Sequence, residues 1–208
     1  MLRQGSEHDG ARLRVEALAV CPARLTSLLS LLEKYTWTME IRAACTEEAE
    51  EACAVIRRSI TELCHADHQG DAPTLSLWLA NKTAENMRRW IAQTYVFVAA
   101  EQGQMFGVGA MNGSGEITLN YVSPDARFRG ISKRLLQRLE LQATDLGIQR
   151  ITLHSSLPAL RLYESAGYRR SGPPTKGFGI TFCHPMIKNL QSGLSGRCSR
   201  LGVSEGRR

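Results

Sequence analysis

Apolar and polar positions alternate along the chain in patterns that predict a succession of strands and helices between residues 39 and 188. Apolar, β-branched runs bounded by glycine or polar turns predict strands at 40–44, 95–101, 105–112, 116–122, 150–154, 168–171 and 179–184. Apolar residues spaced by three and four predict helices at 46–63, within 81–94, from about 130 onward and at 159–165. A short helical turn is expected at 76–80.

Local signals mark the start of the helix at 46–63 and a break in the stretch that follows it. Thr46 is the expected N-cap of the helix at 46–63, and Glu47 and Glu48 place negative charge in its first turn. Ala49 stands at the third helical position, so a capping box is not expected. Pro73 is expected to interrupt helical structure in the segment that follows this helix.

The order of these elements predicts the α+β class, with a mixed, mostly antiparallel sheet and helices on both faces. A chain of 208 residues suits one such domain with short extensions, and we place the domain at residues 39–188. Residues 1–38 are expected to be an N-terminal extension, helical in part at 25–35, and Met39 could be the natural start. Residues 189–208 are rich in Gly, Ser and Arg and are expected to be a disordered basic tail.

The net charge of +6 lies largely outside the predicted domain. Residues 1–38 carry a net charge of +1 and residues 189–208 carry +3, which leaves +2 for the remainder. No basic stripe interleaved with aromatic residues occurs in the predicted domain. Nucleic acid is therefore not favoured as a partner.

The six cysteines include no Cys-x-x-Cys pair, and their spacings fit neither a zinc site nor a dense disulfide framework. Reduced thiols in a cytoplasmic protein are the simplest interpretation. No apolar run approaches the length of a membrane span. Arg12, Arg14 and Glu16 stand where a signal peptide would need an apolar stretch, so we expect neither export nor a membrane partner.

The turn after the strand at 116–122 has the features of an anion site. It carries Arg127, Arg129 and Gly130, and an amphipathic helix follows at once. A helix N-terminus offers free N–H groups and the positive end of the helix dipole, and glycine lets the backbone approach a phosphate closely. The spacing matches neither of the common nucleotide-binding loops, G-x-x-x-x-G-K-[ST] or G-x-G-x-x-G. The turn is suited to hold a pyrophosphate.

Two segments resemble signatures of the GNAT superfamily of N-acetyltransferases. The first is Arg127-x-x-Gly130-x-Ser132, which is similar to the family's loop for the pyrophosphate of acetyl-coenzyme A. The second runs from Ser155 to Tyr168, where Ala159, Tyr163 and the Gly-Tyr pair follow the family's spacing. The resemblance covers about residues 39–188 and implies a single GNAT-like domain. Ser132 departs from the usual Gly or Ala, and Ser156 from a common Asn.

The resemblance implies acetyl-CoA as cosubstrate and a set of residues that bind it. The strand before the loop would hold the pantetheine arm with its backbone, and the loop would hold the pyrophosphate. The implied cofactor-binding residues are Tyr121, Val122, Arg127, Phe128, Arg129, Gly130, Ile131, Ser132, Lys133 and Ser156.

Acetyl transfer to an amine requires a base for the ammonium and a proton donor for the departing thiolate. By resemblance, Tyr163 is the expected proton donor, and Glu116 is the best candidate for the base. Both also have structural interpretations, as a half-buried helix aromatic and as a solvated strand-edge carboxylate. His154 could substitute as base, although a single histidine at a strand end is more often structural.

Cys64, His65, Asp67 and His68 form a cluster of metal-ligand types, but they crowd one helix end without a recurring ligand spacing. No metal is expected. The cluster lies where family members shape the acceptor pocket, so His65, Asp67 and His68 are either acceptor contacts or ordinary helix-end polar residues.

The sequence therefore predicts an enzyme that transfers an acetyl group from acetyl-CoA to a primary amine of a small molecule or peptide. Two alternatives stay open at this point: a non-catalytic acyl-CoA-binding sensor module, and a nucleic-acid-associated protein that uses the basic tail. A homodimer is also left open.

Overall fold

The computed structural model describes residues 39–190. The expected helix at 25–35 and most of the expected tail lie outside the described residues. The described strands are β1 (Glu40–Ala43), β2 (Tyr95–Glu101), β3 (Gln104–Met111), β4 (Glu116–Val122), β5 (Arg150–Ser155), β6 (Arg169–Arg170), β7 (Thr175–Lys176) and β8 (Phe182–Asn189). The α-helices are α2 (Ala49–Leu63), α3 (His65–His68), α4 (Ala72–Leu79), α5 (Ala84–Gln93), α6 (Ile131–Asp145) and α7 (Leu160–Ser165). Short 3₁₀ helices are η1 (Thr46–Glu48), η2 (Pro124–Ala126) and η3 (Leu157–Ala159).

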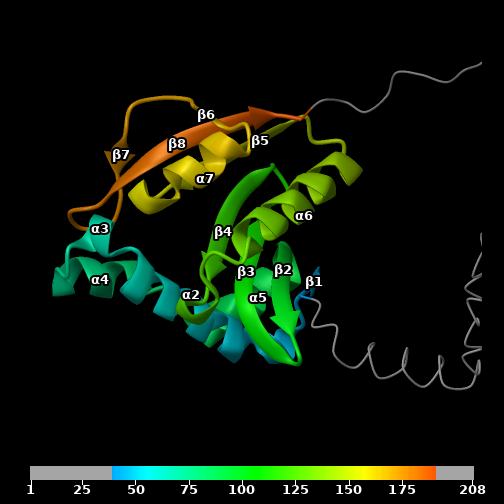
Figure 1. The fold of residues 1–208 in the computed structure, drawn as a ribbon, viewed down its shortest axis with the longest axis horizontal. Helices are drawn as coiled ribbons and strands as arrows, with labels where there is room; N and C mark the ends of the chain where they lie inside the picture. The colour runs from blue at the N-terminus through cyan, green and yellow to red at the C-terminus, as the bar shows by residue number, and fades with distance from the viewer. Residues whose placement is uncertain (1–38, 191–208) are drawn as a thin grey trace, which may run out of the picture. The chain divides into compact units, whose positions relative to one another are not determined.

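The strands lie in the order β1-β2-β3-β4-β5-β8-β6, and β7 pairs with β8 (Figure 1). Neighbouring strands are antiparallel except for β4 and β5, which are parallel. Helices cover both faces of the sheet. The predicted α+β class with a mixed, mostly antiparallel sheet is therefore confirmed.

Two hydrophobic clusters fill the space between the sheet and the helices. On one face, Leu135, Leu139 and Tyr163 from α6 and α7 pack against the sheet. On the other, Ile56 and Met87 from α2 and α5 do the same. Burial of these apolar side chains is the main favourable contribution to the fold.

The N-terminal turn of α6 packs very closely on β3. A Cβ at Gly107 of β3 would lie 2.8 Å from Ile131 Cγ2 and 3.0 Å from Leu135 Cδ1. Such contacts are too short for a larger side chain at this position without a shift of α6. Gly107 pairs with Val122 at the end of β4. The close packing at Gly107 therefore helps to fix the start of α6 beside the end of β4.

Two predicted helix boundaries were wrong. The helix at 46–63 begins with η1, so its N-cap is Cys45 rather than Thr46, and the Cys45 N–H donates to Glu48 Oε2 at 2.8 Å. A capping-box contact is therefore present after all, because the N-cap lies one residue earlier than expected. Pro73 lies in the first turn of α4 rather than interrupting a helix. The N–H groups of the first turn make no intrahelical hydrogen bond, so proline, which lacks an N–H, is tolerated there.

The last predicted strand was misplaced. β8 runs from Phe182 to Asn189 rather than over 179–184. Residues before it form a loop held on α4, where the Ile180 N–H donates to Thr74 Oγ1 at 3.1 Å. Beyond it, the Leu190 N–H donates to Gln149 O at 2.8 Å. Backbone hydrogen bonds of the described residues therefore continue to Leu190.

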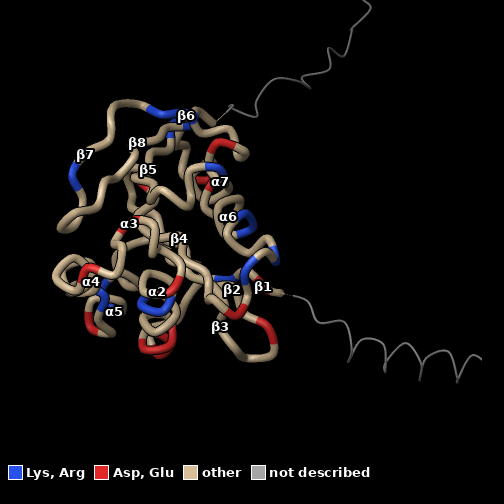
Figure 2. Tube along the Cα trace, turned by 60° about the vertical axis from the view of Figure 1, so that its left-hand side comes forward, with Lys and Arg blue, Asp and Glu red and all other residues tan. Residues whose placement is uncertain are grey.

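Lys and Arg residues of the described fold are distributed over several elements rather than gathered on one face (Figure 2). Within residues 39–190, no helix combines the length and the apolar character that crossing a bilayer demands.

Candidate active site

The two parallel strands at the centre of the sheet separate soon after they meet. β4 and β5 pair only at Glu116–Thr152 and Ile117–Leu153. β4 then continues along β3, and β5 continues along β8. The two strands adjoin at one end and splay at the other (Figure 1). The edge of β4 beyond Ile117 consequently has no strand partner toward β5, and its backbone groups are available to a ligand.

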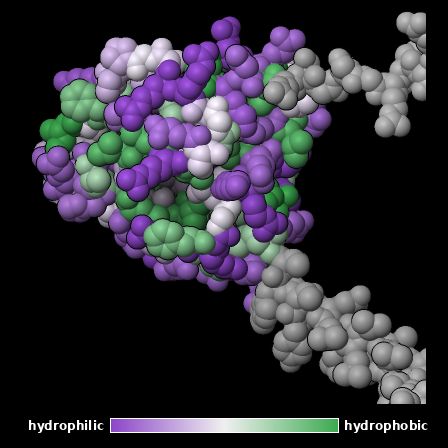
Figure 3. Space-filling model, turned by 45° about the horizontal axis from the view of Figure 1, so that its top comes forward, coloured by the Kyte–Doolittle hydropathy of each residue, from purple (hydrophilic) through white to green (hydrophobic). Residues whose placement is uncertain are grey.

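Two cavities meet at this opening. The first, here called the loop cavity, has a volume of about 350 Å³ and is lined by β4, the turn before α6, the start of α6, α2 and residues around η3. The second, the aromatic cavity, has a volume of about 230 Å³ and lies between β4, β5, α4 and the loop before β8. Asn120, Tyr121, Ser156 and Ala159 line both cavities. The surface of the protein is visibly hollowed on the face shown in Figure 3, with hydrophobic residues in the hollow.

Most of the residues predicted to bind the cofactor line the loop cavity. These are Tyr121, Val122, Arg127, Phe128, Gly130, Ile131, Ser132, Lys133 and Ser156. Arg129 is the exception, because its guanidinium forms an ion pair with Glu101 at 2.7 Å and lies 5.4 Å from the centre of the Phe106 ring. The structure thus gathers nine of the ten predicted residues around one cavity and directs the tenth to β2.

The turn before α6 has the backbone of an anion-binding loop. Phe128 and Gly130 both have left-handed φ values, 61° and 73°. A Cβ built on Gly130 meets no atom within 4 Å, so the space beside it is open. The N–H groups of Ile131, Ser132 and Lys133 lie in the first turn of α6, where helix geometry provides no intrahelical acceptor. They are free to donate to an anion.

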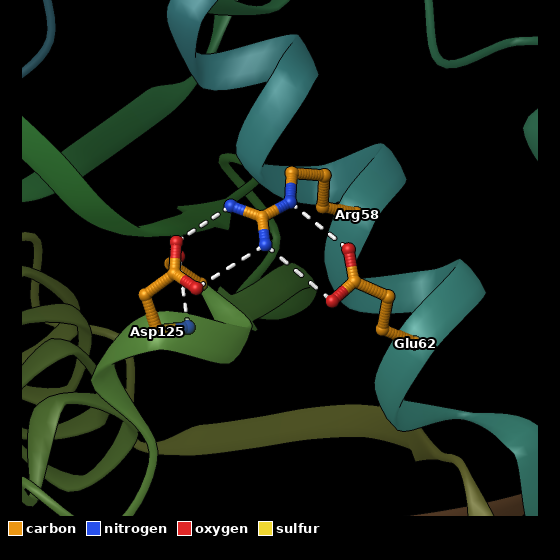
Figure 4. Close-up of polar contacts among 4 residues, drawn as sticks. Arg58, Glu62 and Asp125 are labelled. Atoms are coloured by element: carbon orange, nitrogen blue, oxygen red, sulfur yellow. Dashed lines mark hydrogen bonds and ion pairs between the residues drawn. The ribbon is translucent and has the colours of Figure 1, made fainter.

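An ion-pair network connects this turn with α2 (Figure 4). The Arg58 guanidinium donates to both carboxylate oxygens of Asp125, at 2.7 and 3.3 Å. It also donates from Nε to Glu62 Oε1 at 2.9 Å. Asp125 lies in η2, just before Arg127, and Arg58 and Glu62 belong to α2. The bidentate geometry orients η2 against α2, on the other wall of the loop cavity.

Tyr163 projects from α7 into the core, with its side chain bordering the aromatic cavity. Its ring packs edge-on against Tyr168, with 5.7 Å between the ring centres. Burial raises the pKa of Tyr163 to about 12, an effect that a polar contact with Asn120 partly opposes. The phenol is therefore protonated at neutral pH and able to donate a hydrogen bond.

The sequence predicted a role for the backbone of Asn120 in binding the pantetheine arm, but no role for its side chain. Its Nδ2 donates to Ser132 O at 3.4 Å, which links β4 to α6. Its Oδ1 is buried and has no partner among the described residues. Nothing in the local sequence distinguishes Asn120 from an ordinary strand residue, because its position depends on the separation of β4 from β5.

The two sequence candidates for the base lie side by side. Glu116 Oε1 is 3.7 Å from His154 Nδ1, and Glu116 Oε2 accepts a hydrogen bond from Asn112 Nδ2 at 3.1 Å. His154 lines the aromatic cavity, whereas Glu116 lines neither cavity. Of the two candidates, His154 is therefore the one that borders the space available to an acceptor.

The cluster at residues 64–68 divides between different environments. Asp67 lines the aromatic cavity and Cys64 the loop cavity. His68 is buried, and its Nδ1 accepts a hydrogen bond from the Gly70 N–H at 3.1 Å. His65 and His68 line neither cavity, so Asp67 is the only one of the three predicted acceptor residues that borders a cavity. Within residues 39–190, no group of three or more His, Cys, Asp or Glu side chains is arranged to hold a metal.

Comparisons with known proteins agree with this geometry. Residues 65–190 match the family model described as "Acetyltransferase (GNAT) domain". No curated protein matches the chain. A GCN5-related N-acetyltransferase from Rhodopseudomonas palustris superimposes with a TM-score of 0.67 at 22% identity, over 74% of this chain and 96% of that one.

Two further solved structures contain the coenzyme. The PaiA N-acetyltransferase of Thermoplasma acidophilum, in complex with coenzyme A, has a TM-score of 0.62 at 18% identity, over 74% of this chain and 99% of that one. YncA of Salmonella typhimurium, a putative acetyltransferase with acetyl-CoA, has a TM-score of 0.57 at 18% identity, over 77% of this chain and 99% of that one. These likenesses concern the fold, and the family model covers more than half of the chain. The chain belongs to the GNAT family of acetyltransferases.

Proposed function

We propose that the chain transfers an acetyl group from acetyl-CoA to a primary amine of a small molecule or peptide. The observation that carries the proposal is the opening between β4 and β5, with a loop cavity on one side and an aromatic cavity on the other. Two cosubstrates that enter separate cavities would meet at the residues common to both. PaiA and YncA, which share the fold, have coenzyme A or acetyl-CoA in their structures, which supports the assignment of the loop cavity.

The loop cavity has the features that the coenzyme needs. The free N–H groups at the start of α6, with Arg127 and Lys133 beside them, suit a pyrophosphate. The unpaired edge of β4 suits the amide groups of the pantetheine arm, and its N–H groups can polarise the thioester carbonyl. Ser132 retains this function in our proposal, because its backbone N–H donates regardless of the side chain. We leave Arg129 out, since Glu101 already neutralises it.

We assign the general acid to Tyr163 and the base to the pair formed by His154 and Glu116. The amine loses its proton to the imidazole that borders the aromatic cavity, and the carboxylate 3.7 Å away stabilises the imidazolium. The neutral amine nitrogen then forms a bond to the carbonyl carbon, the bond between carbon and sulfur breaks, and the nitrogen releases its second proton to water to leave the amide. The buried phenol of Tyr163 donates to the departing thiolate.

We also propose that residues 39–190 form the whole acetyltransferase unit, flanked by extensions at 1–38 and 191–208. The four cysteines of the described residues are free thiols, which supports a cytoplasmic location.

A panel of primary amines, with detection of the free thiol released from acetyl-CoA, tests the proposal. Amine-dependent thiol release is expected for at least one class of acceptor. Tight binding of coenzyme A by calorimetry without turnover of any amine would instead favour a sensor module. Absence of both binding and turnover would refute the assignment of the loop cavity.

A further inference from the structure

The aromatic cavity contains two buried charged groups of opposite sign. Asp67, in α3, and Lys82, between α4 and α5, each have 8% of their surface exposed, and both line the cavity. Lysine and aspartate are almost never this buried unless they are paired. Among the described residues, no ion pair joins the two, and no carboxylate lies within 4.0 Å of Lys82 Nζ. Among the described residues, neither charge therefore has a counter-ion within 4.0 Å. His184 and His68 act on Asp67 from a greater distance, and Lys82 Nζ lies 5.5 Å from the centre of the Trp90 ring.

The fold accounts for only one of the two carboxylate oxygens of Asp67. Its Oδ1 accepts a hydrogen bond from the Leu157 N–H at 2.8 Å, which connects α3 to the start of η3. Its Oδ2 is buried and has no partner among the described residues. Burial is the main cause of a raised pKa for Asp67, which the Leu157 N–H partly offsets. A buried acceptor without a donor is costly, and a donor on a ligand would remove that cost.

Lys82 has a similar surplus of hydrogen-bonding capacity. Its ammonium carries three donor hydrogens, and Nζ donates to Asn81 Oδ1 at 2.7 Å. Its carbonyl oxygen accepts from Arg57 Nη1 at 3.1 Å, which fixes the main chain at this point. Burial lowers the pKa of Lys82, so an anion brought by a ligand would favour its charged form.

The rest of the cavity is small, and aromatic and aliphatic side chains alternate with polar ones along its wall. Trp78 and Phe178 stack with their ring centres 5.9 Å apart, and Phe182 lies on the same wall with 58% of its surface exposed. The volume of about 230 Å³ is below the roughly 300–1,000 Å³ of pockets for drug-sized ligands. The acceptor is thus expected to be a small molecule with an apolar portion.

Asp67 also lies near the junction of the two cavities. The residue whose N–H it accepts, Leu157, follows Ser156, which lines both of them. A positively charged amine held by Asp67 would therefore be close to the place where the thioester enters from the loop cavity. Lys82 would contact the other end of the same molecule.

We infer that the acceptor is a small zwitterionic amine of the amino-acid type. Its ammonium pairs with Asp67, its anionic group pairs with Lys82, and its apolar side chain packs against Trp78 and Phe182. A purely cationic amine leaves Lys82 without a counter-ion and adds a like charge to the cavity. The inference rests on the proposed function, since it names the acceptor class for that reaction.

Matched pairs of amines that differ only in the carboxylate test the inference. The full chain is assayed with acetyl-CoA and either L-phenylalanine or phenylethylamine, and either L-leucine or 3-methylbutylamine. Free thiol and N-acetyl product are both measured. We expect kcat/KM to be roughly 10- to 100-fold higher for the amino acid of each pair, the scale of one hydrogen-bonded charge. Equal or inverted preference, with turnover, would overturn the inference and leave the proposed function standing.

Three variants test whether Lys82 and Asp67 cause the preference for the amino acid of each pair. Lys82→Met should remove the preference for the amino acid, and Asp67→Asn should lower turnover of both members of a pair. Lys176→Met, on exposed β7, is the matched control and should change neither. Affinity for coenzyme A by calorimetry identifies any variant that has lost its fold, and the comparison in the unaltered protein does not depend on the variants. Unaltered preference in a folded Lys82→Met protein would contradict the inference, and so would turnover restricted to amines without an anionic group.

Discussion

Replacement of Gly130 by aspartate or asparagine separates shape from charge at the proposed pyrophosphate site. Gly130 has a φ of 73°, and Asn and Asp are the side chains that tolerate this left-handed conformation best. A Cβ at this position meets no atom within 4 Å, so the first atom of either side chain has room. The two variants therefore have nearly the same size and backbone preference, and they differ by one negative charge.

The effect of that charge follows from Coulomb's law. Two unit charges about 5 Å apart interact with roughly 0.8 kcal/mol in water and roughly 3 kcal/mol at an effective dielectric constant of about 20. The lower energy applies to the solvent-exposed part of the turn, and the higher energy applies to the part closer to α6. We expect Gly130→Asp to bind coenzyme A about 4- to 140-fold more weakly than Gly130→Asn, since about 1.4 kcal/mol is a factor of ten.

Calorimetric titration with coenzyme A at two ionic strengths measures the difference. The gap between the two variants should narrow at higher salt, because screening weakens repulsion at an exposed site. Thermal melting curves serve as the control for the fold. Equal affinities of the Asp and Asn variants would show that no phosphate lies near Gly130, and the assignment of this loop would be wrong.

Three further predictions follow from the buried tyrosines and from the ends of the described chain. Tyr163→Phe should leave the affinity for coenzyme A nearly unchanged while kcat falls by about 10²-fold, the scale of one general acid, and an unaltered kcat in a chemistry-limited assay would exclude the phenol from the mechanism. Burial raises the pKa of Tyr121, Tyr163 and Tyr168 above the ordinary value, to about 12 for Tyr163. The folded state then holds these protons more tightly than the unfolded state. The contribution of the three phenols to the free energy of unfolding is therefore fully present below a pH of about 10 and should decrease as the pH rises further. Phenolate absorbance and melting curves, recorded over the same pH range, measure this decrease. Ionisation of all three phenols near pH 10 with the fold intact would contradict the burial. Finally, a protein of residues 39–190 should fold and bind coenzyme A as the full chain does, and aggregation would show that an extension belongs to the domain.

The sequence predicted the elements that depend on local pattern, and it failed where distant segments decide. The turn around Gly130 could be recognised because its glycine, its basic residues and the following helix are contiguous. Arg129 could not be separated from its neighbours, since its partner Glu101 lies on β2, 28 residues away. β8 was misplaced because the loop before it is held by Thr74, and its true register depends on pairing with β5.

The same limitation applies to the acceptor side of the site. Asp67 was noted in the sequence only as part of a crowded polar cluster, and its partner Leu157 is 90 residues away. Lys82 carries no local signal at all, because a lysine in a polar loop is normally solvated. Only the folded arrangement shows that both charges are buried beside one cavity, and that His154 borders this cavity and contacts Glu116.

The transfer itself is tested most directly with acetyl-CoA that carries an isotopic label in its acetyl group. After incubation with the protein and an accepted amine, mass spectrometry of the amine and a thiol assay are performed on the same sample. We predict that the label appears on the amine nitrogen in an amount equal to the free thiol, and that Gly130→Asp slows both together. Thiol release without a labelled amine, or unchanged acetyl-CoA in the presence of a bound amine, would contradict the proposed acetyl transfer.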